Sequence, residues 1–325
     1  MSHEALRRML GGAAALLLVA GCGSSSHRSA PTTPPRPATT APATRPAPTT
    51  QPTTTTTRPR PTTTATTTTA APPPTTAPPP RPGADGLTAR QAATGAWIVD
   101  IDAQRLRVSL MPGKIEPKGT FIHPPTITPD LARTVIAAFN GGFQFRDAQG
   151  GFYLGGVESA PLVAGAASLV IRKDGTATVG AWQRDVTMGP DVEGVLQNLQ
   201  LMVDRGRLTD VTDTDVHRWG STFPRETTPL VPRSGVCVSG DGQLHWVGGL
   251  NIGAATLATT MVQAGCMRGM ELDINPMFVS FAVFDHPDPG NPATIVGHNL
   301  FEGMHYQPSD YVKGRDRNWL MLSTS

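Results

Sequence analysis

The sequence predicts an α+β fold, strand-rich with mixed sheets and a few helices, in a single globular domain at residues 83–325. Three observations predict it. Short runs of branched apolar residues alternate with turn signals along this part of the chain, as expected for strands. Helical periodicity is clear in one segment only. The composition changes abruptly near residue 82 and separates a segment that can bury a core from one that cannot.

Residues 1–21 predict a lipoprotein signal peptide. Arg7 and Arg8 precede an uncharged apolar run that has the length of a secretory h-region and is too short to span a bilayer comfortably. The run ends in Val-Ala-Gly-Cys, which resembles a bacterial lipobox, so we expect cleavage before Cys22 and a lipid on that residue. An ordinary signal peptide cut near Ala20 is the alternative. Both predict an exported chain, and the first places it on the outer face of the cell membrane.

Residues 22–82 predict a disordered tether rich in Thr and Pro. Roughly 38 of the 52 residues from 31 to 82 are Thr or Pro, and none is an apolar residue larger than Ala. Such a segment buries too little surface to offset the entropy of ordering it. The same stretch carries five arginines and no acid, whereas residues 83–325 hold 19 Lys and Arg against 24 Asp and Glu. We therefore expect no nucleic-acid partner for the folded domain.

Three pairs of strands are predicted to form hairpins, because each pair flanks a turn signal. The pairs are residues 96–101 with 106–110, 168–172 with 176–182, and 235–239 with 243–247. The turns between them are Asp-Ala-Gln-Arg, Lys-Asp-Gly-Thr and Ser-Gly-Asp-Gly-Gln. The second turn is the clearest hairpin signal in the chain.

The other elements are predicted singly. An apolar strand is expected at residues 134–139, preceded by a short helical turn that Thr128 caps. Residues 254–264 carry apolar side chains at helical spacing and stop at a glycine, which predicts a helix. The segment after residue 286 is rich in Pro, Gly and Asn, so we expect it to wrap the surface before a last strand at 319–322.

Cys237 and Cys266 predict a disulfide. If Cys22 carries lipid, they form an even pair in an exported and therefore oxidising setting. The bridge would close a loop of about 30 residues and would stabilise the fold by about 3 kcal/mol in the chain-entropy model. Two buried free thiols are the alternative.

Residues 269–275 carry the strongest chemical signal. Apolar side chains alternate there with Glu271, Asp273 and Asn275, so a strand would place these three polar residues on one face. The carboxylate-bearing residues would have Cα atoms roughly 6.5–7 Å apart. Paired carboxylates near this distance act as acid and base or nucleophile in glycoside hydrolysis. The structural alternative is that one carboxylate binds an arginine or caps the turn before Pro276.

Two further segments carry candidate binding residues. Asn140, Gly141 and Gly142 end a buried strand, and glycines there allow positive φ and let backbone N–H groups approach a ligand. A tight turn is the alternative. Arg233 begins a strand and could hold a phosphate or carboxylate through two hydrogen bonds, unless it is only a surface charge. For Asn198 we expect a core or turn role.

Common cofactor and nucleophile motifs are absent from the sequence. The eight histidines are scattered, and no HExxH, CxxC, EF-hand, Walker or GxSxG pattern is present. We therefore expect neither a metal nor another cofactor.

The three segments, in this order, resemble the phosphodiester glycosidase family. Its features are Asn-Gly-Gly-Phe after a strand, an arginine that opens a hairpin, and a late Leu-Asp-Gly-Gly-Gly-Ser that follows a helix. Here they correspond to residues 140–143, to Arg233 and to Leu272 with Asp273. The resemblance covers most of residues 95–285. The chain departs from the family after the aspartate, where Ile-Asn-Pro-Met replaces the glycines.

The resemblance implies a hydrolase that cleaves sugar-1-phosphodiester linkages in cell-envelope or extracellular glycans. The resemblance implies Asn140, Gly141, Gly142 and Arg233 as substrate-binding residues and Asp273 as a catalytic residue. Glu271 and Asn275 are not part of the family's motif; we predict Glu271 as the second catalytic carboxylate and Asn275 as a substrate-binding residue because they share a strand face with Asp273. The arginine and the glycine amides would face the phosphate. The aspartate would stabilise the oxocarbenium-like centre or activate water, with the glutamate as its acid–base partner.

Two other functions stay open at this point. A non-catalytic, cell-wall glycan-binding lipoprotein would keep the fold with a changed site, which the missing glycines favour. A structural partner in wall assembly would require an exposed apolar patch.

Overall fold

The computed structural model describes residues 85–220 and 230–324. Within them the chain forms three sheets with few helices, which confirms the predicted strand-rich α+β class and single globular domain. The signal peptide, Cys22 and the tether at 22–82 lie outside the described residues and stay predictions. No helix in the described ranges is long and apolar enough to cross a membrane.

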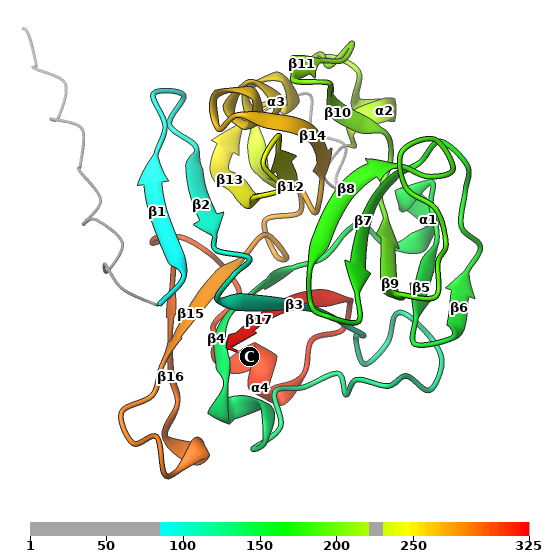
Figure 1. The fold of residues 1–325 in the computed structure, drawn as a ribbon. Helices are drawn as coiled ribbons and strands as arrows, with labels where there is room; N and C mark the ends of the chain where they lie inside the picture. The colour runs from blue at the N-terminus through cyan, green and yellow to red at the C-terminus, as the bar shows by residue number, and fades with distance from the viewer. Residues whose placement is uncertain (1–84, 221–229, 325) are drawn as a thin grey trace, which may run out of the picture. The chain divides into compact units, whose positions relative to one another are not determined.

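Seven antiparallel strands form sheet A, in the spatial order β1-β2-β13-β12-β14-β10-β11 (Figure 1). Their bounds are β1 Leu87–Gln91, β2 Trp97–Ile101, β10 Leu201–Asp204, β11 Arg207–Leu208, β12 Val231–Ser239, β13 Leu244–Ile252 and β14 Cys266–Glu271. The pair β12 and β13 confirms the hairpin predicted around Ser-Gly-Asp-Gly-Gln, with longer strands than expected. A short helix, α2 (Val216–Trp219), follows β11.

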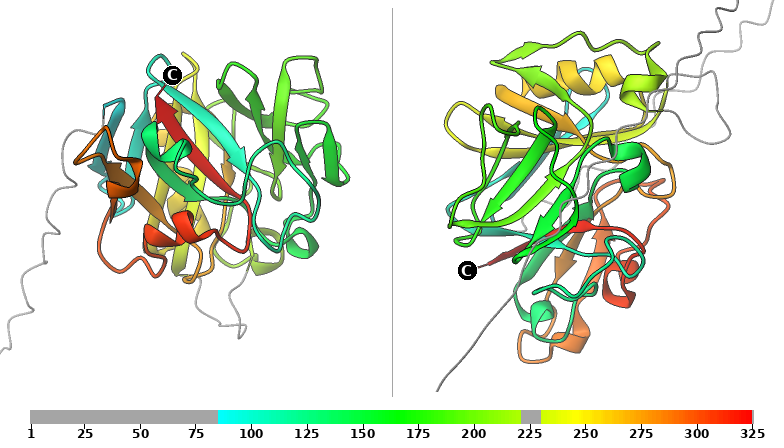
Figure 2. Two further views of the ribbon diagram at one scale, coloured as in Figure 1. Left: turned by 90° about the horizontal axis from the view of Figure 1, so that it is seen from below. Right: turned by 90° about the vertical axis from the view of Figure 1, so that its right-hand side faces the viewer.

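Helix α3 (Ala254–Gln263) lies across one face of sheet A and confirms the predicted helix (Figures 1 and 2). Its close approach depends on two glycines of the sheet. A Cβ on Gly235 of β12 would lie 2.3 Å from Met261 Cε, and one on Gly269 of β14 would lie 2.6 Å from Met261 Sδ. Larger residues at these positions would therefore force the helix away from the strands.

The predicted disulfide between Cys237 and Cys266 is confirmed. It joins neighbouring strands β12 and β14 with a Cα–Cα distance of 5.7 Å. Both cysteines are buried in the core between sheet A and α3. The cross-link therefore ties together the two strands that carry Arg233 and Glu271.

Five antiparallel strands form sheet B, in the order β16-β15-β4-β17-β3. Their bounds are β3 Leu106–Met111, β4 Val135–Asn140, β15 Phe281–Asp285, β16 Val296–Asn299 and β17 Trp319–Thr324. The last predicted strand, β17, lies between β4 and β3, so the C-terminal segment is part of the interior of this sheet (Figures 1 and 2).

Three short helical segments accompany sheet B. They are η1 (Leu131–Arg133), η2 (Pro292–Thr294) and α4 (Ser309–Lys313). The turn predicted before β4 is η1, a single 3₁₀ turn whose Leu131 N–H donates to Thr128 Oγ1 at 3.3 Å.

The hairpin predicted at residues 96–110 is wrong, although both of its strands exist. β2 pairs with β1 and β13 in sheet A, whereas β3 pairs with β17 in sheet B. The N–H of Leu106 donates to the carbonyl of Asp102, four residues back, at 2.9 Å. This wider turn differs from a two-residue hairpin turn and directs the chain from one sheet into the next.

Five antiparallel strands form sheet C, in the order β6-β5-β9-β7-β8. Their bounds are β5 Phe152–Leu154, β6 Val157–Ala160, β7 Ala167–Arg172, β8 Ala177–Ala181 and β9 Val192–Gln197, and α1 (Phe145–Ala148) precedes them. The β7–β8 hairpin confirms the prediction from Lys-Asp-Gly-Thr, and Gly175 in its turn has φ +81°. A positive φ is the conformation for which glycine is preferred there.

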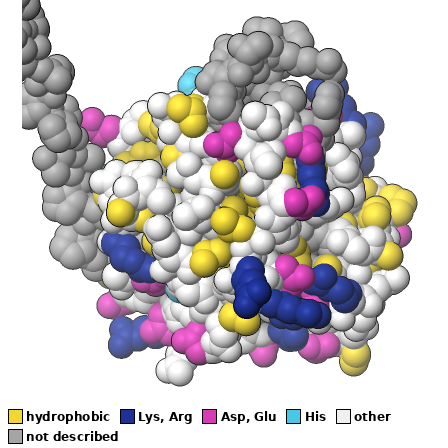
Figure 3. Space-filling model, turned by 90° about the horizontal axis from the view of Figure 1, so that it is seen from above, with side chains coloured by type: hydrophobic (Ala, Val, Ile, Leu, Met, Phe, Trp, Pro, Cys, Tyr) yellow, Lys and Arg dark blue, Asp and Glu magenta, His cyan; other side chains and the backbone are white. Residues whose placement is uncertain are grey.

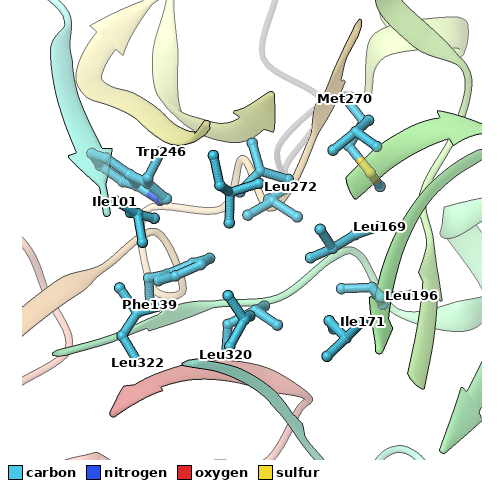
Figure 4. Packing of buried hydrophobic residues seen from close by; sticks show 14 of the residues in the cluster. Ile101, Phe139, Leu169, Ile171, Leu196, Trp246, Met270, Leu272, Leu320 and Leu322 are labelled. Atoms are coloured by element: carbon cyan, nitrogen blue, oxygen red, sulfur yellow. The ribbon is translucent and has the colours of Figure 1, made fainter. Parts of the chain in front are cut away.

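The main hydrophobic core lies where the three sheets meet. Figure 4 shows Trp246 and Leu272 from the sheet A side, Phe139 and Leu320 from sheet B, and Leu169 from sheet C around one interior. Burial of each such side chain stabilises the fold by roughly 1.5–3 kcal/mol. The core therefore fixes the three sheets relative to one another. The polar residues at the ends of β4 and β14 lie directly beside it.

The outer surface over α3 shows small scattered hydrophobic areas (Figure 3). Basic side chains gather on part of this face with acidic ones between them (Figure 3). Mixed charge of this kind is typical of a solvated surface.

Candidate functional site

Asn140 joins sheet B to sheet A at the centre of the site. It is the last residue of β4, and its Nδ2 donates to Ser234 Oγ of β12 at 2.9 Å. Its Oδ1 accepts the backbone N–H of Ser280 at 3.0 Å. Ser234 in turn donates from its backbone N and its Oγ to the carbonyl of Asp273, at 3.1 and 3.0 Å. This network fixes the backbone of Asp273, while the substrate contact predicted for Asn140 stays a prediction.

The strand that carries the two carboxylates is shorter than predicted. β14 ends at Glu271, but the Leu272 N–H still donates to the Ser234 carbonyl at 2.8 Å. The chain therefore stays beside β12 as far as Asp273. Glu271 is fully buried and Asp273 is 3% exposed. Carboxylates so far from water require specific partners.

Glu271 pairs with Arg233 inside sheet A. Arg233 Nη1 lies 2.6 Å from Glu271 Oε1 and also donates to the Trp219 carbonyl at 2.8 Å. Arg233 is only 2% exposed, so it is not a surface charge. Burial raises the pKa of Glu271 to about 7; Arg233 opposes this rise, and the nearby charge of Asp273 adds to it.

Asp273 pairs with a different arginine. Arg317 Nη2 lies 2.6 Å from Asp273 Oδ2, and the Asn275 N–H donates to Asp273 Oδ1 at 2.8 Å. Burial raises the pKa of Asp273, against the opposing effects of Arg317 and the backbone donor. A pairing of Asp273 with Arg233, which the sequence leaves open, is not formed. Instead each carboxylate has its own guanidinium, and Asp273 also caps the turn.

Arg317 connects the buried pair to a cavity of about 400 Å³. Its guanidinium carbon lies 3.4 Å from the ring centroid of Phe278, a cation–π contact. Burial lowers the pKa of Arg317, and Asp273 opposes that change. Both Arg317 and Phe278 line the cavity, together with Phe145 and Glu116. One side chain therefore separates the cavity from the Asp273 carboxylate.

Gly141 and Gly142 pack against Asn318, and the phosphate contact predicted for them stays a prediction. Neither has a positive φ. The Gly141 N–H donates to the Asn318 carbonyl at 3.1 Å, and the Gly142 N–H donates to Asn318 Oδ1 at 3.2 Å. A Cβ on Gly141 would lie 1.8 Å from Asn318 Oδ1. The glycines thus allow Asn318 to pack against the end of β4, and their amides already have acceptors.

Asn275 lies in the turn that replaces the family's glycines. Its Oδ1 accepts the Met277 N–H at 2.9 Å, and its carbonyl accepts the Phe278 N–H at 2.8 Å. These contacts are typical of an Asx turn. The structure therefore gives the side-chain oxygen of this residue a structural partner, while its predicted contact with substrate stays a prediction.

Several site residues were missed in the sequence. Asn198, given a core or turn role, accepts the Phe143 N–H at 3.0 Å and donates to the Glu271 carbonyl at 3.0 Å. The others are Ser234, Ser280, Arg315, Arg317 and Asn318. The last three come from the segment expected to wrap the surface, and that expectation is wrong for them because all three are buried.

Arg315 supports the turn from behind. Its Nη1 donates to Ser280 Oγ at 2.5 Å and to the Tyr311 hydroxyl at 2.6 Å, and its Nη2 donates to the Phe278 carbonyl at 3.0 Å. It also lies 3.9 Å from the ring centroid of Tyr306. Arg315 thereby fixes the residue on which Arg317 is stacked.

Four buried polar atoms of the site have no hydrogen-bond partner within the described part of the chain. They are Arg233 Nε, Glu271 Oε2, Arg317 Nε and Asn318 Nδ2. Leaving such an atom unpaired costs about 1–3 kcal/mol. Of these four residues, only Arg317 lines the cavity. Among the residues described, no group of three His, Cys, Asp or Glu could hold a metal ion.

No family model matches the sequence, and no curated protein matches it. Among solved structures, the chain is similar to the catalytic domain of zebrafish N-acetylglucosamine-1-phosphodiester alpha-N-acetylglucosaminidase, auto-inhibited by its pro-peptide. The TM-score is 0.43 and the identity 13%, over 77% of this chain and 87% of that one.

Two bacterial structures are similar at a lower level. A hypothetical protein from Synechocystis has a TM-score of 0.40 and 10% identity, over 74% of this chain and 61% of that one. A putative exported protein from Burkholderia pseudomallei has a TM-score of 0.25 and 13% identity, over 73% and 57%. Values this low assign no activity to this chain.

Proposed function

We propose that this protein is an exported, lipid-tethered hydrolase that cleaves sugar-1-phosphodiester linkages in cell-envelope or extracellular glycans. The reaction releases the sugar and leaves a phosphomonoester. The anchor is the lipid expected on Cys22, and the site is the carboxylate pair of Glu271 and Asp273. The resemblance of the three sequence segments supports the substrate class.

The observation that carries the proposal is that Arg317 belongs both to the cavity wall and to the ion pair of the site. It lines the cavity and also forms the ion pair with Asp273. A phosphodiester bound at the cavity would lie against the guanidinium of Arg317, whose planar set of donors suits phosphate oxygens. Its glycosidic carbon would then lie on the side of Asp273, which could stabilise positive charge or activate water.

Glu271 has the properties of the acid–base partner. A pKa of about 7 leaves the carboxyl group partly protonated at neutral pH, so it can both donate and accept a proton. Arg233 holds it in one orientation. In this proposal Arg317 makes the phosphate contact that was predicted for the Gly141 and Gly142 amides, because those amides are bonded to Asn318.

A non-catalytic, glycan-binding lipoprotein is the second candidate. Both carboxylates are closed into ion pairs, and the turn at Asn275 contains Pro276 where the family has glycine. These contacts fit a site that binds a glycan in the cavity without catalysing a reaction.

Product analysis separates the two candidates. The full-length chain, purified in detergent, is incubated with N-acetylglucosamine-1-phosphodiesters that carry a chromogenic leaving group. The hydrolase predicts free N-acetylglucosamine and a phosphomonoester in equal amounts. Binding of cell-wall glycan with no release of either product would favour the receptor and contradict the proposal.

A further inference from the structure

The cavity beside Arg317 has a chemical character of its own. Phe145 and Phe278 supply aromatic walls, and Glu116, Lys118, Asp316 and Arg317 supply charge. The charge of Arg317 is already matched by Asp273. The remaining wall therefore carries two carboxylates against one ammonium group, so an anion other than the phosphate proposed to lie against Arg317 is disfavoured there.

Glu116 presents an unmatched acceptor in this wall. Its Oε1 accepts the Phe145 N–H at 3.2 Å, which fixes the carboxylate in place. Its Oε2 is covered from solvent and has no donor within residues 85–220 and 230–324. Arg317, which is 92% buried, contributes an Nε donor that also has no partner there. Glu116 and Arg317 both line the cavity, so the two side chains belong to one wall.

A hydroxyl-rich ring fits these features together. A hydroxyl group donates to a carboxylate oxygen, and the C–H face of the same ring packs on an aromatic side chain. One face of Phe278 is occupied by Arg317, so Phe145, whose ring also contacts Phe152, is the other aromatic side chain of the wall. A carboxylate or a second phosphate on that ligand would approach Glu116 and Asp316 and would be repelled.

We propose that this cavity binds a hydroxyl-rich group without negative charge, such as a neutral sugar or polyol, and that Glu116 makes it selective against anionic glycans. The inference rests on the proposed function only in placing this group next to the phosphate of a diester. Glu116 is the specificity-determining residue: its carboxylate accepts a ligand hydroxyl, and its charge repels a uronate.

The test compares two ligands that differ in one group. D-Glucose and D-glucuronate are titrated into the full-length chain by calorimetry, in the wild type and in Glu116→Gln. Glutamine keeps the size of the side chain and an oxygen for the Phe145 N–H, so folding should be retained. The matched control is Asp185→Asn, which removes a carboxylate outside the cavity that pairs with Arg184 and Arg268.

The wild type and Asp185→Asn should bind glucose roughly fivefold to tenfold more tightly than glucuronate. Glu116→Gln should lose most of this preference and should bind glucose several-fold more weakly. Undetectable binding of glucose, equal binding of both sugars by the wild type, or a preference unchanged in Glu116→Gln would each overturn the inference.

Neither probe contains a phosphodiester, so the titration does not depend on turnover. Missing selectivity in a chain that hydrolyses phosphodiesters would overturn the cavity assignment alone. Selectivity in a chain without hydrolysis would contradict the proposed hydrolase alone.

Discussion

The two carboxylates of the site are held in different ways, although one residue separates them in sequence. Glu271 ends a strand of sheet A and pairs with Arg233 of the neighbouring strand, where both side chains are enclosed. Asp273 follows that strand and pairs with Arg317, which comes from the segment before β17 and lines a cavity. A sheet thus fixes the inner half of the site, while a long-range contact from the C-terminal segment fixes the half that a ligand can reach.

The largest expected difference between the two halves is the loss of stability when each arginine is replaced. Arg233→Met leaves the carboxylate of Glu271 unpaired in the interior, which should lower the free energy of unfolding by about 3–5 kcal/mol. Arg317→Met should cost only about 1–3 kcal/mol, because Asp273 keeps the Asn275 N–H as a donor. Urea unfolding measures both. Equal losses would show that the two halves are equally enclosed.

The pH dependence of stability should sharpen the difference. Burial raises the pKa of Glu271 from 4.5 to about 7 in the folded protein, so the folded state binds this proton more tightly than the unfolded chain. Its contribution is therefore complete below about pH 4.5 and is lost as the pH rises to about 7, a loss of roughly 3 kcal/mol. Glu271→Gln should flatten this slope.

The control for this slope is Asp185→Asn, which should keep it because Asp185 lies outside the Arg233–Glu271 pair. Unfolding free energies measured across the same pH range check both variants. A slope that survives in Glu271→Gln would mean that another group titrates there.

The two glycines after β4 offer a smaller, matched comparison. A Cβ on Gly141 would lie 2.6 Å from the Asn318 backbone carbonyl, whereas one on Gly142 would have its nearest neighbour, Asn198 Oδ1, at 3.1 Å. Gly141→Ala should therefore destabilise by roughly 2–3 kcal/mol and Gly142→Ala by about 1 kcal/mol. Thermal unfolding of both variants checks the order, and a reversed order would contradict the packing of Asn318 against Gly141.

Local patterns in the sequence were sufficient for the inner half of the site. Alternation identified Glu271 and Asp273 as a polar pair, and strand and turn signals placed Arg233 on a neighbouring hairpin. The Asp-Gly turn of β7 and β8 was predictable because a positive φ at Gly175 is a local requirement.

The outer half had no such signal. Arg317 lies 44 residues after its partner Asp273, and Asn318 lies 177 residues after its partner Gly141. No periodicity in the sequence connects residues so far apart. The β2–β3 turn was misinterpreted for a related reason: the partner of each strand is set by sheets assembled from distant segments. The position of Arg317 and Asn318 and the course of the β2–β3 turn therefore both depend on tertiary contacts.

The most direct test of the account is turnover by Asp273→Asn. The variant keeps the size of the side chain, and Asp185→Asn is the matched control. We expect hydrolysis of the N-acetylglucosamine-1-phosphodiester to fall at least about 100-fold in Asp273→Asn at a temperature at which circular dichroism shows the variant to be folded. Its melting temperature should fall, because Arg317 loses its buried carboxylate partner. Hydrolysis that persists in a folded Asp273→Asn protein, or a loss of hydrolysis that only follows unfolding, would contradict a catalytic role for this carboxylate.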